Sequence, residues 1–94
     1  MYVIKYDVRP RPNNPDYGKV MSREVTIIVN ESTSVAAEAA ARSLLDRIEC
    51  DVESQDEASW LDIDIYAAGT PGRAIVERAQ AEGIALILGP RFPP

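Results

Sequence analysis

The amino-acid sequence predicts an α+β fold, a two-layer α/β sandwich in which two helices cover one face of a four-stranded sheet. Four runs have the alternating or continuous apolar pattern of strands, and two runs have apolar residues at helical spacing. The order is strand, strand, helix, strand, helix, strand (ββαβαβ), and such elements bury their apolar sides by packing helices on a sheet. The 94 residues form a single domain over 1–94.

The first two strands are expected over 2–8 and 20–29, because β-branched and aromatic residues alternate with polar ones in the first and dominate the second. A Pro-rich loop over 9–19, with three prolines, two asparagines and a glycine, joins them. Consecutive strands joined by a loop pair most simply in the antiparallel direction. A ferredoxin-like order would need a helix inside this loop, and its prolines argue against that.

The first helix is expected over 35–49, where Ala37, Ala41, Leu44 and Ile48 recur at helical spacing. Residues 50–59 are polar and acidic and are interpreted as a loop. The third strand is expected over 60–66, because apolar and polar residues alternate along it.

The second helix begins with Thr70 as its cap and Pro71 in the first turn, and Gly83 follows its end. The apolar run 84–88 predicts a last strand inside the sheet. If this strand is a parallel neighbour or near-neighbour of the third strand, the crossover between them is right-handed. The tail 89–94 is expected to be extended and outside the ladder, since proline donates no hydrogen bond.

The charge of the chain is concentrated in one segment. The formal net charge is −5, but residues 46–64 alone sum to −7 and the rest of the chain to +2. The acidic residues of this segment are Asp46, Glu49, Asp51, Glu53, Asp56, Glu57, Asp62 and Asp64, against Arg47 alone. A patch of one sign steers a basic partner and repels nucleic acid and anionic membranes.

We therefore expect a small non-enzymatic protein-binding module, an inhibitor or adaptor, that docks a basic protein surface and binds neither nucleic acid nor membrane directly. Tryptophan is enriched at interface hot spots, and Trp60 lies within the acidic segment. The expected partner-binding residues are Asp51, Glu53, Asp56, Glu57 and Trp60. The competing explanation is that Trp60 starts the third strand and packs under the helix. Size and charge are similar to those of small acidic phage-encoded inhibitors of bacterial defence systems, a likeness that involves no motif.

Two other functions stay open. The run Gly69, Thr70, Gly72 and Arg73 opens a helix and could hold a phosphate or carboxylate as a small-molecule site. It matches no established phosphate loop, and an ordinary helix cap is the favoured explanation. A self-assembling structural component is the third possibility, with the basic residues of the Pro-rich loop in one copy meeting the acidic segment of another in a homo-oligomer.

No cofactor, catalytic group or metal site is expected. The chain has no histidine, which removes the commonest general base and metal ligand. Asp62 and Asp64 could share a divalent ion, but no further ligand is placed near them, so a solvated strand face is favoured. Cys50 is flanked by acidic residues that work against thiol activation. A single cysteine, with no signal peptide or membrane-length apolar run, predicts a cytoplasmic protein.

Overall fold

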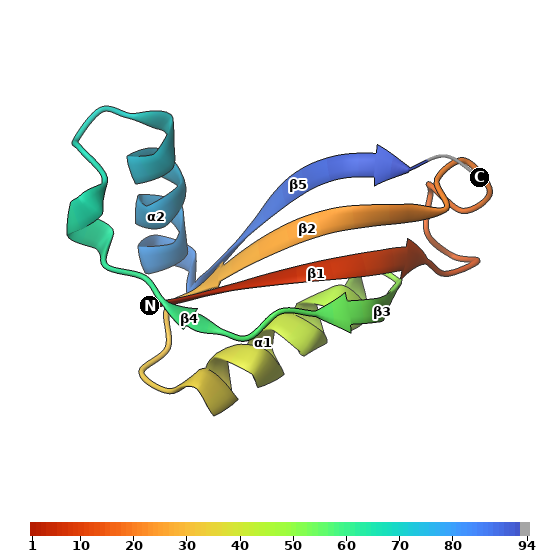
Figure 1. Cartoon of the computed structure of the whole chain (residues 1–94), viewed down its shortest axis with the longest axis horizontal. Helices are drawn as coiled ribbons and strands as arrows, with labels where there is room; N and C mark the ends of the chain where they lie inside the picture. Colours follow the sequence, from red (N-terminus) through yellow and green to blue (C-terminus); the bar gives the residue numbers. More distant parts are fainter. Residues whose placement is uncertain (93–94) are drawn as a thin grey trace.

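The computed structural model describes residues 1–92 and confirms the α+β fold, with two helices against an open antiparallel sheet (Figure 1). The elements in chain order are β1 (Tyr2–Pro10), β2 (Ser22–Val29), α1 (Ser34–Arg47), β3 (Cys50–Gln55), β4 (Ser59–Trp60), the 3-10 turn η1 (Ile63–Ile65), α2 (Pro71–Glu82) and β5 (Ile84–Phe92).

The four main strands lie in the order β3-β1-β2-β5, and every neighbouring pair is antiparallel. The short strand β4 pairs with the start of β1, on the same side of β1 as β3. The last strand was expected inside the sheet, but β5 is an edge strand, and the parallel crossover considered for it does not occur among residues 1–92. β5 returns beside β2 instead, because the segment 61–70 and α2 carry the chain back to the end of the sheet where β2 finishes.

The two helices cover opposite faces of the sheet, not one face as expected (Figure 1). α1 packs with Ala37, Ala41 and Leu45 on the face that carries Ile27 of β2. α2 packs with Val76 and Ala79 on the adjacent residue Ile28, whose side chain points to the other side. The uninterrupted apolar run at the end of β2 thus places apolar side chains in the cores on both faces of the sheet.

A third strand forms at Cys50–Gln55, where the sequence predicted an acidic loop. Its alternating residues Cys50 and Val52 turn toward the α1 side, while Asp51 and Glu53 remain exposed. The strand pairs with the second half of β1, which extends to Pro10 and shortens the predicted Pro-rich loop.

The strand predicted over 60–66 is wrong beyond Trp60. A local hydrogen bond replaces the ladder there: the backbone N–H of Asp64 donates to the Asp62 carboxylate at 3.0 Å, and η1 follows. Aspartate side chains compete with strand pairing in this way, so the alternating pattern of the segment was misleading.

The tail also differs from the prediction, since β5 continues through Gly89 and Pro90 to Phe92. A register shift between Arg23 and Val25 accommodates these residues. A Cβ on Gly89 would lie 2.7 Å from the carbonyl oxygen of Glu24, so only glycine fits this approach. The end of the predicted tail, residues 93–94, lies outside the described residues.

Candidate partner-binding site

Trp60 lies at the edge of the sheet and is presented to solvent. It pairs with Tyr2 across the β1–β4 ladder, and the two rings meet edge to face with centroids 5.2 Å apart. The residue is nevertheless 63% exposed. This geometry is that of an aromatic ring held in place on one side and free on the other, so the packing under a helix suggested as an alternative is not observed.

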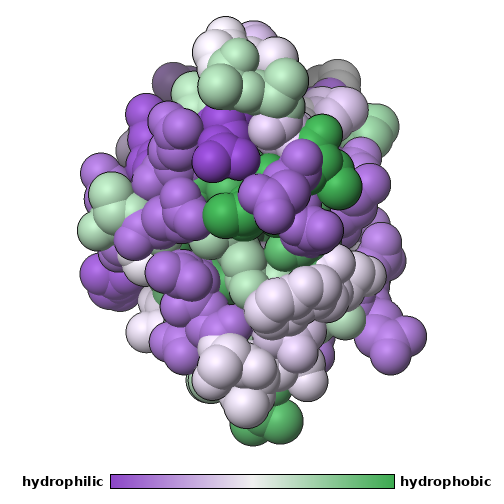
Figure 2. All heavy atoms as spheres, turned by 90° about the vertical axis from the view of Figure 1, so that its left-hand side faces the viewer, coloured by the Kyte–Doolittle hydropathy of each residue, from purple (hydrophilic) through white to green (hydrophobic). Residues whose placement is uncertain are grey.

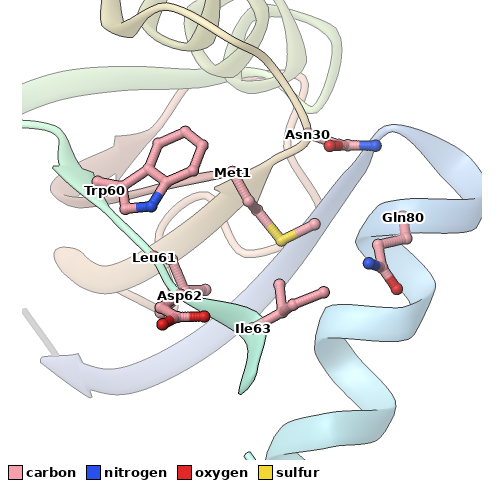
Figure 3. A pocket seen from close by; sticks show the side chains of 7 residues that line it. All are labelled: Met1, Asn30, Trp60, Leu61, Asp62, Ile63 and Gln80. Carbon is pink, nitrogen blue, oxygen red and sulfur yellow. The ribbon is translucent and has the colours of Figure 1, made fainter. Parts of the chain in front are cut away.

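A hollow of about 190 Å³ adjoins Trp60 (Figure 3). Its lining comes from the chain start, the segment after β2, the β4–η1 segment and α2, namely Met1, Asn30, Trp60, Leu61, Asp62, Ile63 and Gln80. In Figure 3 the Met1 side chain lies between Trp60 and Gln80, and Ile63 projects toward α2. The backbone N–H of Leu61 donates to the Met1 carbonyl at 2.8 Å and anchors this corner.

The hollow has an apolar floor and polar surroundings. Figure 2 views the side of the molecule that carries α2 and the start of β1, and it shows hydrophobic atoms recessed among hydrophilic ones. Met1 is buried, whereas Asp62 is exposed. An apolar side chain of a partner could enter here while its polar neighbours remain at the rim.

The first half of the acidic segment is ion-paired within the chain. Arg11 donates to Asp46 at 2.6 Å and to Asp51 at 2.8 Å, and Arg9 donates to Glu53 at 2.9 Å. The hydrogen bonds to Asp46 and to Asp51 raise the pKa of the Arg11 guanidinium above its ordinary value. Basic loop and acidic strand therefore meet inside one molecule, the contact that the sequence suggested between copies.

The second half of the segment carries its charge unpaired. Residues 56–64 contain four carboxylates and no basic residue. None of Asp56, Glu57, Asp62 and Asp64 forms a salt bridge with any other residue of 1–92. We call these four residues, which flank Trp60 in sequence, together with Trp60 the Trp60 surface. Of the four, Asp62 lines the hollow beside Trp60, whereas Asp56 lines a separate hollow with Lys5 and Ser54. Asp51 and Glu53 were expected in the same site. They lie on β3 instead, where Asp51 pairs with Arg11 and Glu53 pairs with Arg9.

The residues of the predicted anion site have structural contacts of their own. The Arg73 guanidinium donates to the Ile63 carbonyl at 3.1 Å and lies 3.3 Å from Glu77, so it ties η1 to α2. Thr70 caps α2 by accepting from the Arg73 N–H at 3.3 Å, as predicted. A Cβ on Gly72 would come within 2.6 Å of the Tyr66 ring. These contacts account for the run without a ligand, and the anion site stays a prediction.

The acidic residues and the cysteine considered for metal or thiol chemistry lie as follows in the described part of the chain. Within residues 1–92, no group of three or more histidine, cysteine, aspartate and glutamate side chains is placed to hold a metal ion. Asp62 and Asp64 do not share a strand face, because Asp62 caps η1. Cys50 is buried, and burial raises the pKa of its thiol, which disfavours the reactive thiolate.

Comparison of the chain with protein-family models, with curated proteins and with solved structures gives no match. Neither helix of the described chain is long and apolar enough to cross a membrane. The sequence pointed to Trp60 and its acidic neighbours but missed Met1, Tyr2 and Gln80, since no local pattern signals residues that come together from three distant segments.

Proposed function

We propose that this protein is a non-enzymatic binding module, an inhibitor or adaptor, that docks a basic protein surface through the Trp60 surface. The observation that carries the proposal is the exposure of Trp60, held by Tyr2 on one edge and surrounded in sequence by carboxylates that form no salt bridge within residues 1–92. The chain also lacks histidine, the commonest acid–base catalyst.

The two parts of the surface have different physical roles. The Trp60 ring and the neighbouring hollow supply apolar area that loses water on contact, and hot spots of this kind contribute about 2 kcal/mol or more each. The carboxylates of Asp56 and Glu57 attract a basic partner over a distance of about 8–10 Å at ordinary salt concentrations, which raises the association rate. The internal ion pairs of Asp51 and Glu53 make those two residues weaker contributors.

Selection from a displayed library of random peptides on the immobilised protein tests the proposal. We expect enrichment of peptides that combine lysine or arginine with an aromatic or long apolar residue. Their affinity should fall by about 30-fold or more on Trp60→Ala, the equivalent of a 2 kcal/mol hot spot. A library that yields no basic sequence, or peptides whose affinity ignores Trp60→Ala, would contradict the proposal.

A matched pair of charge reversals separates local from overall electrostatics. Glu57 belongs to the Trp60 surface, whereas Glu38 lies on α1, and neither forms a salt bridge within residues 1–92. Both changes to lysine alter the net charge equally. We expect Glu57→Lys to lower the affinity for the peptide clearly more than Glu38→Lys does. The dependence of binding on salt concentration should also fall more with Glu57→Lys. Equal effects would mean that only the net charge matters.

A further inference from the structure

In the described part of the chain, the strand β5 has an unpaired edge, and the residues along this edge are apolar. It pairs with β2 on one side, and no strand of residues 1–92 pairs with the other (Figure 1). The Asn30 N–H donates to the Gly83 carbonyl at 2.9 Å, which fixes the alternation of the ladder. The backbone groups of Ala85 and Ile87 therefore face β2, and those of Ile84, Leu86 and Leu88 face outward.

The side chains at this edge are apolar and only partly covered. The run 84–90 contains no charged residue. α1 lies over β1, β2 and β3, so Ile84 and Leu86 are half-buried and Leu88 is 55% exposed. Folded proteins normally protect such an edge with charges, prolines or a covering element. Here Pro90 protects only the far end of the strand, so the stretch before it is left open to a partner strand.

We infer that a second copy of this chain pairs with the free edge of β5 in an antiparallel, two-fold symmetric dimer. Outward-facing residues must meet outward-facing residues, and the register centred on Leu86 uses all of them. Leu86 then meets Leu86 of the second copy, and Ile84 meets Leu88 of the second copy on both sides of the axis. Each such pair exchanges two backbone hydrogen bonds, and the sheets of the two copies become continuous.

Self-pairing is favoured over a foreign strand because the two ends of β5 complement each other. In this register Glu82, at the end of α2, lies at the same end of the paired strands as Arg91 of the second copy, so opposite charges share each end, and the symmetry repeats this arrangement. Neither residue forms a salt bridge elsewhere in 1–92. Two copies with a net charge of −5 each repel one another over most of their surfaces. The uncharged run between these opposite charges is where that repulsion is weakest.

The dimer also joins the partly covered apolar strips of both molecules. Directly opposed residues of an antiparallel pair project to the same side, so Ile84, Leu86 and Leu88 of both copies lie on the side covered by α1. The α2 helices lie on the other face, against opposite ends of the paired strands. The Trp60 surface is at the opposite edge of each sheet, beside β1, and stays free. The inference is therefore independent of the proposed binding function.

Two measurements on the unmodified chain test the dimer. Sedimentation equilibrium over a dilution series should show a reversible species of twice the 10.3 kDa chain mass. Amide hydrogen exchange should show the outward N–H groups of Ile84, Leu86 and Leu88 gaining protection as the dimer forms. A monomeric mass throughout the series overturns the inference. A dimer whose outward amides exchange freely also overturns it, since the contact then lies elsewhere.

A pair of substitutions of matched exposure adds a control. Leu88 is 55% exposed and Met21, just before β2, is 52% exposed. Leu88→Lys places a charge in the interface twice, so we expect the dissociation constant of the dimer to rise by about tenfold or more. Met21→Lys should leave it unchanged, with circular dichroism confirming that both variants fold. Equal weakening by both changes would count against pairing through β5.

Discussion

Replacing Trp60 by alanine separates a partner-binding role from a structural one. Trp60 is 63% exposed, so folding removes only about a third of its surface from water. A tryptophan side chain can bury up to about 250 Å², so the buried third amounts to about 80–90 Å². At about 25 cal/mol per Å², that area contributes about 2 kcal/mol as an upper estimate.

The edge-to-face contact with Tyr2 is included in this small loss, since the two rings meet with their centroids 5.2 Å apart. We expect Trp60→Ala to lower the free energy of unfolding by about 2 kcal/mol or less, against about 3–5 kcal/mol for a tryptophan in a core. Urea unfolding followed by far-ultraviolet circular dichroism measures the difference, because the variant has no tryptophan to report by fluorescence.

Leu45→Ala is the matched reference for this measurement. Leu45 is 1% exposed in the cluster beneath α1, and its truncation should cost about 2–5 kcal/mol. A loss at Trp60 as large as that of a buried tryptophan would refute the reasoning, because the ring would then belong to the core. Any effect of the variant on binding would in that case reflect unfolding.

Three further predictions concern the fold. Ile28→Ala should cost about 2–4 kcal/mol in urea unfolding because Ile28 lies under α2, and a loss below about 0.5 kcal/mol, usual at a surface position, would contradict a sheet covered on both faces. Gly72→Ala should lower the melting temperature although alanine favours helices, because its Cβ would meet the Tyr66 ring, and a raised melting temperature would contradict that packing. Burial raises the pKa of Cys50, so its contribution to stability is present below the ordinary thiol pKa and is lost as pH rises through the folded-state value. Unfolding measured from about pH 7 to about pH 10 should therefore show a steeper loss in the native chain than in Cys50→Ala, and parallel curves would contradict the assignment.

Sequence reasoning located the elements whose signals are local. The capping of α2 by Thr70, with Pro71 in its first turn, needs only neighbouring residues, and Gly83 ends it in the left-handed conformation with φ +87°. The strands β1 and β2 were likewise visible from their composition, and α1 from its apolar spacing. In each case the deciding interactions join residues within one element or one turn.

The errors arose where distant residues decide the structure. β3 resembles an acidic loop, because its partners Arg9 and Arg11 lie about 40 residues earlier in the chain. Because the arginines are so distant in sequence, the pattern also did not reveal that the first half of the acidic segment forms salt bridges and that the second half forms none within residues 1–92. The position of α2 on the second face depends on Ile28, and a run of apolar residues does not reveal which side each one faces until the neighbouring strands are known.

The fluorescence emission of Trp60, the single tryptophan of the chain, reports whether a basic partner covers its ring. Titration of the protein with a selected basic peptide should shift the emission to shorter wavelength, because the exposed indole loses water on contact. The midpoint should move to higher peptide concentration as salt is added, since the carboxylates of the Trp60 surface are then screened. A peptide that binds by calorimetry and leaves the emission unchanged would contradict coverage of Trp60 by the partner.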